Sequence, residues 1–530
     1  MPSLAAKYDV TIIGGGHNGL VSACYLAKAG LSVLVLEKNP ELGGATRSEQ
    51  AFDGMEARLS VYSYLVSLLP ERIISDLGLT LDLLPRRTAS YTPRIKDGHL
   101  NELLLLNHDP IHNQRAFADL TGSDSDYLGY ADLQSMQERL SSVIWSSLTE
   151  PLVSKTDMTN RLDDKGREAW QSFIEEPLGQ VIEKKISSDL IRGLVFTDAK
   201  IGVSTHPHDP SLLQNRCFLY HVIGQGTGEW RVPKGGMGKL MSELVRVAES
   251  TGKVTFATNA TVHSVDSGEK LSSLVFEIDG KDAQVDARFV LCNASAKELA
   301  RLTGKTETSV TVDEGTAFKV NMLLKRLPRL RSDKCTPEQA FAGTFHLNEG
   351  YGQMQESYDS SCSGEIPVTP PGEIYCHTLT DPSILSPQLQ SQGFHTLTLF
   401  GLDMPYRLFE KDNQRARDTA LQKYLAGINQ YLDEPIEECL ASDSQGKPCI
   451  EAMSSVDLEK KIHLPKGNIF HGDLTWPFAE SDEEVGLWGV ETEYPNLFLC
   501  GSSAKRGGAV SGIPGHNAAK KVLQESMDGS

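Results

Sequence analysis

Three glycines and one glutamate near the start of the chain have the types and the spacing needed to bind a dinucleotide. Gly14, Gly16 and Gly19 follow the G-x-G-x-x-G pattern, and Glu37 comes 18 residues after Gly19. Gly14 permits a sharp turn, Gly16 lets the backbone approach a pyrophosphate, and Gly19 lets a helix pack closely on a strand. The Glu37 carboxylate can accept hydrogen bonds from both ribose hydroxyls. The pattern therefore predicts a nucleotide site, and an acid at position 37 disfavours a 2′-phosphate.

The residues around this pattern predict the elements that hold it. Residues 10–13 form a β-branched apolar run typical of a buried parallel strand, residues 20–29 favour a helix, and residues 31–36 form a second apolar run. Gly30 stands where the glycine after a helix is expected. The start of the helix would direct free N–H groups and a partial positive charge at a phosphate. We therefore expect a strand, a tight turn, a helix and a second strand.

A second glycine pair, Gly43-Gly44, follows the second strand and is followed by Arg47. Alone, such a pair is typical of an ordinary turn. Beside the first pattern it resembles the extended signature of FAD-binding amine oxidase and carotenoid desaturase-type flavoproteins. In that family the pair lets the backbone pass the cofactor's phosphates, and a following basic residue often assists. The resemblance favours FAD over NAD as the cofactor. The candidate cofactor contacts in this first part of the chain are Gly14, Gly16, His17, Asn18, Gly19, Glu37, Lys38, Gly43, Gly44 and Arg47.

Two segments in the middle of the chain resemble further cofactor-binding parts of the same family. Gly235-Gly236 opens a helix, which is followed by strand segments at 254–256 and 259–265. The resemblance implies that the backbone at Val262 contacts adenine, because extended backbone offers both a donor and an acceptor. The apolar run 289–292 then ends at Asn293, which the resemblance places near the cofactor.

The last part of the chain resembles the final FAD motif of the desaturase-type enzymes. A buried strand ends at Gly501 and Ser502, where many relatives place an acid instead of the serine. A glycine turn and a helix follow. The resemblance implies that this turn directs N–H groups and the helix dipole at the flavin's pyrimidine edge, which stabilises negative charge on the reduced flavin. The candidate contacts of this turn are Val510, Ser511 and Gly512.

Candidate residues on the substrate side are less sharply marked, and no catalytic residue is assigned. Residues 318–324, 372–378 and 395–400 alternate as strands of a second sheet. Glu373, Tyr375 and His377 would share one face of it, where they could perform acid–base chemistry beside a flavin or could simply face solvent. Three further candidates for substrate contact come from other segments of the chain. A tyrosine in such a segment is often a core residue whose hydroxyl is already hydrogen-bonded. The three candidates are Arg58, Tyr64 and Trp230.

Taken over nearly the whole chain, these motifs resemble the phytoene dehydrogenase-like flavoproteins. The resemblance implies an α/β protein with a Rossmann-type (GR2-like) FAD-binding domain and an inserted mixed-sheet α+β substrate domain. At 530 residues the chain exceeds the size of a single core, so two domains are expected. We place the FAD-binding domain at residues 1–90, 225–310 and 465–530, and the substrate domain at 91–224 and 311–464.

Composition narrows the classes of function. Lys and Arg number 51 against 70 Asp and Glu, a net charge of −19, which disfavours nucleic acid and anionic membranes as partners. The nine cysteines form no C-x-x-C pair, which excludes dithiol flavoenzymes and favours reduced thiols in a cytoplasmic protein. Residues 205–210 contain two histidines and an aspartate between prolines, and we expect a loop there and no metal. No apolar run is long enough for a transmembrane segment. The sequence leaves the oligomeric state undecided, and a homo-oligomer is possible.

These observations predict an FAD-dependent oxidoreductase. The expected chemistry is hydride abstraction from a C–C or C–N bond of a small or lipophilic organic substrate, by a dehydrogenase, desaturase or oxidase. The electron acceptor stays open between oxygen, a quinone and another molecule. Two alternatives also stay open, because one scaffold supports several chemistries. They are a flavin-dependent isomerase without net redox change and an FAD-containing scaffold or interaction protein.

The first prediction tests the position of the cofactor. Gly16→Val should abolish FAD binding, because a side chain would occupy the space through which the pyrophosphate approaches the backbone. The flavin absorbance of the purified variant measures this. A Gly16→Val protein with full flavin absorbance would refute the placement.

Overall fold

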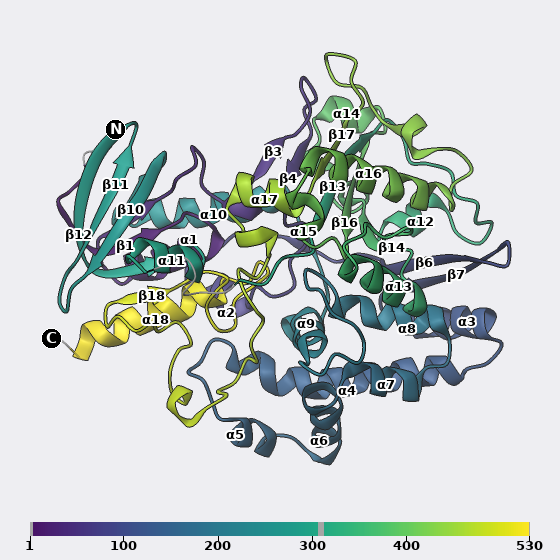
Figure 1. Ribbon diagram of the computed structural model, residues 1–530, viewed down its shortest axis with the longest axis horizontal. Helices are drawn as coiled ribbons and strands as arrows, with labels where there is room; N and C mark the ends of the chain where they lie inside the picture. Colours follow the sequence, from purple (N-terminus) through teal and green to yellow (C-terminus); the bar gives the residue numbers. More distant parts are fainter. Residues whose placement is uncertain (1–3, 306–311, 529–530) are drawn as a thin grey trace.

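Two β-sheets and a layer of helices make up the computed structural model, which describes residues 4–305 and 312–528 (Figure 1). In these residues the first sheet has the order β10–β11–β12–β1–β2–β9, and β18 pairs with the end of β12. The pairs around β1, β2, β9 and β18 are parallel, and β10–β11–β12 is an antiparallel meander. The strands are β1 (Lys7–Ile13), β2 (Val33–Leu36), β9 (Val254–Ala257), β10 (Ala260–Ser267), β11 (Ser272–Ile278), β12 (Lys281–Cys292) and β18 (Leu497–Leu499).

Three helices pack on one face of this sheet: α1 (His17–Lys28), α10 (Met237–Ser250) and α18 (Ile513–Asp528). Helix α1 is buried along most of its length between the sheet and its two neighbours. This explains its small and apolar residues. The predicted strand, turn, helix and second strand are all present, and the helix begins earlier than its apolar run, directly after Gly16. Gly30 takes a φ of +95°, as expected for the residue that lets the chain leave a helix.

The second sheet is mixed and has the order β17–β13–β16–β15–β14–β6–β7 among the described residues. β14 and β6 are parallel, and the other neighbours are antiparallel. An α/β protein with a Rossmann-type sheet and a second, mixed sheet is thereby confirmed. The strands are β6 (Thr88–Lys96), β7 (His99–Leu106), β13 (Phe318–Leu324), β14 (Thr344–Leu347), β15 (Gly372–Tyr375), β16 (His395–Gly401) and β17 (Ile450–Met453).

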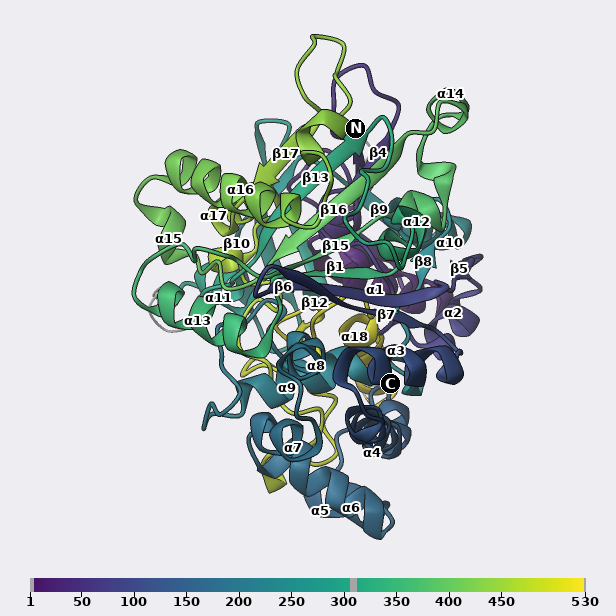
Figure 2. The same ribbon diagram turned by 90° about the vertical axis from the view of Figure 1, so that its right-hand side faces the viewer.

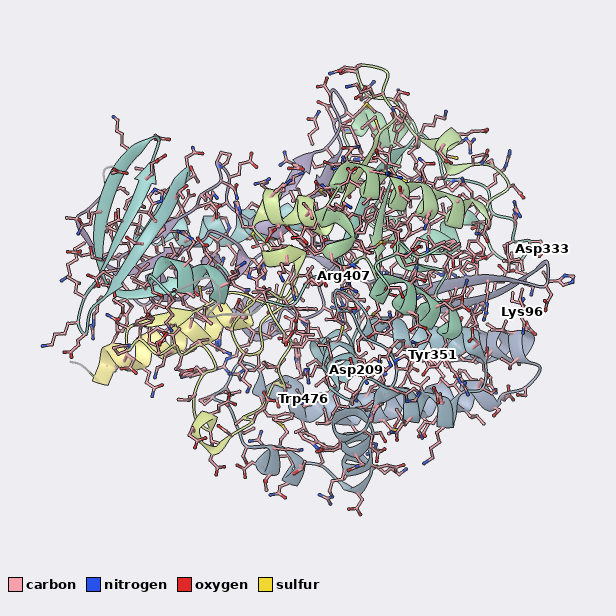
Figure 3. All side chains as sticks on the ribbon, in the orientation of Figure 1. Lys96, Asp209, Asp333, Tyr351, Arg407 and Trp476 are labelled. Atoms are coloured by element: carbon pink, nitrogen blue, oxygen red, sulfur yellow. The ribbon has the colours of Figure 1, made fainter. Side chains whose placement is uncertain are left out.

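A layer of helices lies below the second sheet in Figure 1, and the turned view in Figure 2 shows it on the same side. The residues after α17 (Ser455–Ile462) return to this layer, where Figure 3 labels Trp476. Trp476 stacks on Phe478, and Phe478 lies against Trp170. Residues 166–194 form several helices and not one, because Pro177 cannot continue the preceding helix. The helices are α3 (Pro110–Thr121), α4 (Ser125–Ser147), α5 (Lys155–Asn160), α6 (Asp164–Trp170), α7 (Leu178–Lys185), α8 (Asp189–Phe196) and α9 (Leu213–Val222).

Shorter elements connect these layers. Two small pairs of strands, β3 with β4 and β5 with β8, and several further helices lie outside the two sheets. They are β3 (Ser48–Gln50), β4 (Arg58–Ser60), β5 (Leu83–Leu84), β8 (Val232–Pro233), α2 (Glu71–Leu77), α11 (Ala296–Leu302), α12 (Pro337–Phe341), α13 (Tyr351–Cys362), α14 (Pro387–Ser391), α15 (Arg407–Glu410), α16 (Asn413–Asn429) and α17 (Ser455–Ile462). Among the residues described, no helix has both the length and the apolar character needed to cross a bilayer.

The distribution of strands supports the domain limits that we propose. The first sheet draws its strands from residues 7–36, 254–292 and 497–499, and the second from 88–106 and 318–453. The chain therefore leaves the first sheet and returns to it twice. On this basis we keep 1–90, 225–310 and 465–530 as the proposed FAD-binding domain and 91–224 and 311–464 as the proposed substrate domain.

The contact between α1 and α18 should not tolerate a larger residue at Gly515. A Cβ at Gly515 would lie 2.1 Å from the Asn18 carbonyl oxygen, so the two helices would have to separate. We expect Gly515→Ala to lower the free energy of unfolding by about 1–3 kcal/mol, measured by thermal or denaturant unfolding. Met527→Ala, at an exposed position of the same helix, is the control and should change it little. Equal stability of the two variants would contradict this packing.

Candidate cofactor and substrate site

A cavity of about 610 Å³ opens where the parallel strands of the first sheet end. Its lining includes Gly14 after β1, Glu37 after β2 and Asn293 after β12. In open α/β sheets, ligands bind beyond the carboxyl ends of the strands. From there the cavity continues to Tyr64, which packs on Phe400 of the second sheet, and to His221 of the helical layer. One elongated cavity thus joins the nucleotide motif to the inserted part of the chain.

The glycine turn between β1 and α1 has the geometry that the pattern predicts. Gly14 takes a φ of +97°, a conformation that other residues rarely adopt. A Cβ at Gly19 would lie 2.5 Å from the Gly14 carbonyl oxygen, so only glycine allows this close contact. Gly16 caps α1 without any side-chain hydrogen bond to the first turn. The N–H groups of that turn are therefore not satisfied by a capping side chain and can bind an anion.

Glu37 is fixed at the end of β2 by two backbone groups. Its carboxylate accepts hydrogen bonds from the N–H groups of Gly15 and Asn39, both at 2.8 Å. The side chain is buried, yet it lines the cavity. An ionised carboxylate has about four acceptor positions, so two remain for ribose hydroxyls. Glu37 therefore both orders the glycine turn and keeps the capacity to bind the ribose.

The glycine pair lies directly beside the turn. Gly43 donates its N–H to the Gly15 carbonyl at 2.9 Å, and both members of the pair have positive φ, +120° for Gly43 and +51° for Gly44. Gly44 lines the cavity, and Gly43 lies behind it against Met241. Arg47 lies outside the lining, near Glu41 and Glu49. The pair thus keeps the backbone close to the glycine turn.

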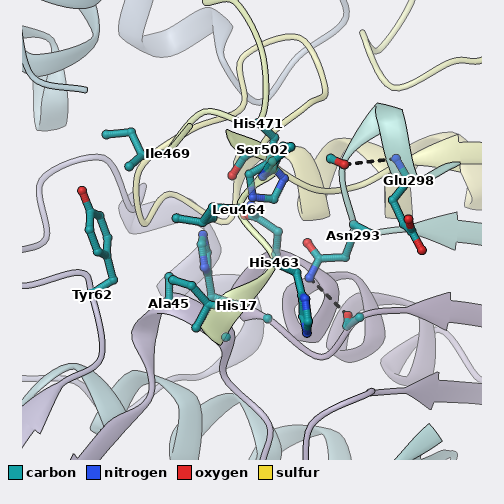
Figure 4. Close-up of a pocket in the computed structure, with 18 of the residues that line it drawn as sticks. His17, Ala45, Tyr62, Asn293, Glu298, His463, Leu464, Ile469, His471 and Ser502 are labelled. Carbon is teal, nitrogen blue, oxygen red and sulfur yellow. Dashed lines mark hydrogen bonds between the residues drawn. The ribbon is translucent and has the colours of Figure 1, made fainter. Parts of the chain in front are cut away.

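Asn293 ties the end of β12 to the glycine turn, because its side-chain amide donates to the Gly14 carbonyl at 3.2 Å (Figure 4). The turn before α18 completes this wall. A Cβ at Gly501 would lie 2.6 Å from the Asn293 carbonyl oxygen, so a glycine is required there too. The Ser511 hydroxyl accepts the Ile513 N–H at 3.2 Å and orders the start of α18. Segments from both ends of the chain therefore form one wall.

The predicted cofactor residues divide into a lining group and a supporting group. Those in the lining are Gly14, Gly16, His17, Asn18, Glu37, Lys38, Gly44, Val262, Asn293, Ser502 and Val510. The remaining candidates lie outside it, and several shape the backbone behind it; they are Gly19, Gly43, Arg47, Gly501, Ser511 and Gly512. Their roles toward a cofactor stay predictions.

The other end of the cavity is aromatic and apolar. In Figure 4, Tyr62 and Ile469 lie on the side opposite to Asn293 and Glu298. Tyr64 packs on Phe400 with ring centroids 3.9 Å apart. Trp230 stacks on His221 with centroids 5.9 Å apart. The side chains that wall this end include Tyr62, Tyr64, Leu65, Ile201, His221, Trp230, Ile469 and Phe470.

The predicted substrate-side residues are not all brought together. Tyr64 and Trp230 line the main cavity, and Tyr375 and Glu373 lie behind Tyr64, joined to it by hydrogen bonds. Arg58 and His377 line a separate cavity of about 30 Å³, which Tyr64 also borders. The polar face of β15 does not face solvent, because Glu373 and Tyr375 are buried between the layers.

Apart from His17, the histidines that line the main cavity were not identified from the sequence. Burial lowers the pKa of His17, His221 and His471, each to about 4, so these rings are neutral at physiological pH. The His221 ring donates from Nδ1 to the Cys217 carbonyl at 2.7 Å, and His17 Nε2 lies 3.1 Å from the Ala509 carbonyl. His463 and His471 come from the loop after α17, which has no periodic pattern that could have placed them.

A second group of titratable residues lies beyond the cavity. His346, Glu349 and Glu373 are buried, and their side-chain donor atoms lie within 4.8 Å of one another. His346 Nδ1 and Glu349 Oε2 are 2.5 Å apart, which is a short hydrogen bond. Two ligands of one tetrahedral zinc would be separated by roughly 3.3 Å, given metal–ligand lengths of about 2.0 Å. We therefore interpret the group as hydrogen-bonded side chains. No metal was expected from the sequence, and none is assigned.

The residues present fit FAD. The helix start lacks a side-chain cap, the glycine turn leaves the backbone accessible, and Glu37 stands at the end of β2 with free acceptor positions. The cavity continues far beyond this nucleotide end to an aromatic chamber. Such a shape suits a dinucleotide whose reactive ring reaches that chamber. Adenosine would meet Glu37 and Val262, and the pyrophosphate would meet Gly16.

Comparisons with known proteins agree with this geometry. The family model described as an NAD(P)-binding Rossmann-like domain matches residues 12–69. The chain is 30% identical to pyridine nucleotide-disulfide oxidoreductase domain-containing protein 2 of Mus musculus, over 98% of this chain and 94% of that protein. It is 44% identical to a limonene dehydrogenase chain of Castellaniella defragrans, over 98% and 94% of the two chains. The cyclohexylamine oxidase of Brevibacterium oxydans shares the fold, with a TM-score of 0.56, 15% identity and coverage of 98% and 99%.

The chain therefore belongs to the family of pyridine nucleotide-disulfide oxidoreductase domain-containing protein 2, among the FAD-dependent oxidoreductases of the phytoene desaturase type. The expected resemblance, the enzyme class and the FAD cofactor are thereby confirmed. The disulfide in the family name has no counterpart here, since every cysteine in the described residues is a free thiol.

Replacing Glu37 should weaken FAD binding. Glu37→Gln keeps the shape but directs an amide NH₂ at one of the two backbone N–H groups, which then loses its acceptor. The neutral amide also weakens the hydrogen bonds that the ribose hydroxyls would donate to the carboxylate. A hydrogen bond to a charged group contributes about 1.5–3 kcal/mol, so we expect FAD affinity to fall roughly 10-fold or more. Titration of the apoprotein with FAD, followed by flavin fluorescence, measures this. Glu41→Gln, on the exposed loop nearby, should bind FAD like the original protein.

Proposed function

We propose that this chain uses FAD to remove a hydride from a C–C or C–N bond of a lipophilic organic substrate. The aromatic and apolar walls of the far chamber carry the proposal, because they favour an apolar substrate and exclude water. Charged lining residues such as Glu37, Lys38, Glu298 and Arg301 belong to the nucleotide end, on β2, α11 and their flanks. A relative named limonene dehydrogenase supports a hydrocarbon substrate.

In this proposal the protein contributes position and environment. When bound, FAD supplies a two-electron acceptor for the hydride. Tyr62, Trp230 and Phe470 hold the substrate between flat faces, and this alignment reduces the entropy cost of reaching the reactive geometry. His221 is neutral, since burial lowers its pKa to about 4, so it adds no charge that an apolar substrate would have to displace. The Ser502 hydroxyl and the turn before α18 border the cofactor end.

The test is anaerobic mixing of the purified flavoprotein with candidate substrates. We expect limonene or a similar apolar hydrocarbon to bleach the flavin band, and putrescine, a dication, to leave it unchanged. Recovery of the colour when air is admitted identifies an oxidase, and persistent bleaching identifies a dehydrogenase that needs a quinone or another acceptor. Bleaching by the dication alone would contradict a lipophilic substrate. A substrate that is isomerised without bleaching would replace the proposal by an isomerase, and bound flavin that is inert to the whole panel would favour a scaffold.

A pair of tryptophan variants locates the substrate. Trp230→Leu removes a wall of the far chamber, and we expect the bleaching rate at limiting substrate to fall roughly 10-fold, consistent with the loss of about 1–2 kcal/mol of aromatic contact. Trp145→Leu, in helix α4 and outside the lining, is the matched control. Stopped-flow absorbance measures both. Equal losses in the two variants would show a general effect on stability and not a substrate contact.

A further inference from the structure

A buried cluster of acids and one histidine lies behind the substrate chamber. Strands β14 and β15 place His346 and Glu373 directly opposite each other. Glu349 follows β14, and Asp198 approaches from the helical layer after α8. The exposed fractions of His346, Glu349 and Glu373 are 4%, 1% and 3%. His346 and Glu349 share a hydrogen bond of 2.5 Å, and the donor atoms of the three residues lie within 4.8 Å of one another.

Two tyrosines connect this cluster to the substrate chamber. The Tyr375 hydroxyl donates to Glu373 Oε2 at 2.5 Å. The Tyr64 hydroxyl lies 3.3 Å from the Tyr375 oxygen and 3.5 Å from Glu373 Oε2. Tyr64 itself lines the chamber. A chain of hydrogen bonds therefore begins at the chamber wall and ends at a carboxylate that is shielded from solvent.

Three acids of the cluster face one cation, Arg86, among the residues whose charges act on Glu373 in the described part of the chain. Arg86 lies 5.8 Å from the centre of the Tyr375 ring and donates to the Trp230 carbonyl and to Thr344. Glu373, Glu349 and Asp198 together would carry three negative charges if all were ionised. Isolated charges are costly to bury, so such a group retains protons or shares them. Fully ionised acids are therefore not the expected state at neutral pH.

The pKa values of these groups agree with acids that retain protons at neutral pH. Burial and the charge of Glu349 raise the pKa of Glu373 to about 7. Burial raises the pKa of Asp198 to about 7 as well, and that of Glu349 well above its ordinary value. His346 has its pKa lowered by burial, and the Cys217 thiol facing the same acids has its pKa raised well above the usual range. Protons can therefore enter and leave the cluster near neutral pH.

We propose that Tyr64, Tyr375 and Glu373 form a path that carries a proton from the substrate into the buried cluster, with Glu373 as its acceptor. This inference rests on the proposed function. Tyr64 is the group that meets the substrate, and Glu373 acts through it. His346 and Glu349 adjust the charge beside Glu373 and so set the pH at which it accepts.

The transfer balances in protons and electrons. The substrate loses a hydride, with its two electrons, to the oxidised cofactor, and loses a proton from the neighbouring atom to the Tyr64 oxygen. The electron pair of that second bond stays on the substrate and forms the new double bond. Tyr64 passes its own proton to Tyr375, and Tyr375 passes its proton to the Glu373 carboxylate. Each tyrosine ends neutral, and only Glu373 gains a proton.

The first experiment follows the carboxyl group without any substrate. Infrared difference spectra of the flavin-loaded protein over a pH series should contain a protonated-carboxyl signal that decreases as the pH rises through about 7. Glu373→Gln, which keeps the size of the side chain, should lose part of that signal. Glu102→Gln is the matched control, because Tyr91 donates to Glu102 at 2.6 Å in a similar pair on β6 and β7, away from the cavity. An unchanged titration in Glu373→Gln would overturn the proposal, as would a stoichiometric divalent metal in the purified protein.

The second experiment measures the pH dependence of flavin bleaching by the hydrocarbon that is active in the panel above. A carboxylate must be ionised to accept a proton, so the rate should rise with pH and level off above about 7. We expect Glu373→Gln to be about 100-fold slower or more and to lose this inflection. Tyr64→Phe should be slow but keep the infrared signal, and Glu373→Asp should recover part of the inflection.

The two proposals can fail separately. If the hydrocarbons bleach the flavin and Glu373→Gln keeps the original pH profile, the proton path is wrong and the proposed function stands. If nothing in the panel bleaches the flavin, the proposed function fails, and the proton path fails with it as a step of that reaction. The infrared titration then still decides whether Glu373 is the buried acid that titrates near neutral pH. Flavin absorbance and melting temperature confirm that each variant is folded.

Discussion

The close approach of backbone to backbone around α1 is the constraint on which the rest of the structure depends. Gly19 lies against the Gly14 carbonyl, and Gly515 of α18 lies against the Asn18 carbonyl. These contacts hold the start of α1 at the edge of the sheet, without a side-chain cap on its first turn. The N–H groups of that turn therefore face the cavity. The positions of Glu37 and Asn293 follow from the same placement, since both side chains bond to the glycine turn.

The cavity joins two chemically different regions. At the nucleotide end, backbone N–H groups and charged side chains suit a phosphate and a ribose. At the far end, aromatic rings and neutral histidines suit an apolar molecule. Burial contributes to this difference, because it lowers the pKa of His221 to about 4 and removes its positive charge at neutral pH. The same burial raises the pKa of Glu373 and lets it hold a proton behind Tyr64.

The nucleotide half of the site could be predicted from the sequence because its information is local. A strand, three glycines and a terminal acid lie within one short segment, and the second glycine pair follows at once. The substrate half could not be predicted in the same way. Tyr62, His221 and Phe470 come from three distant segments, and no local pattern shows that they meet. The alternation around Glu373 predicted a strand correctly, but alternation does not show which face a neighbouring layer covers. Tyr64, from outside the sheet, contacts the Glu373 carboxylate, and this acid is buried and not solvated.

The central claim is that the cavity holds FAD with its reactive ring toward the aromatic chamber. The most direct test is the flavin content of the purified protein, measured by absorbance and by identification of the nucleotide released on denaturation. The account predicts one FAD per chain and loss of that FAD when Gly16 is replaced by valine. A protein that is isolated without flavin, does not take up FAD, and instead binds NAD or NADP in the same cavity would contradict it.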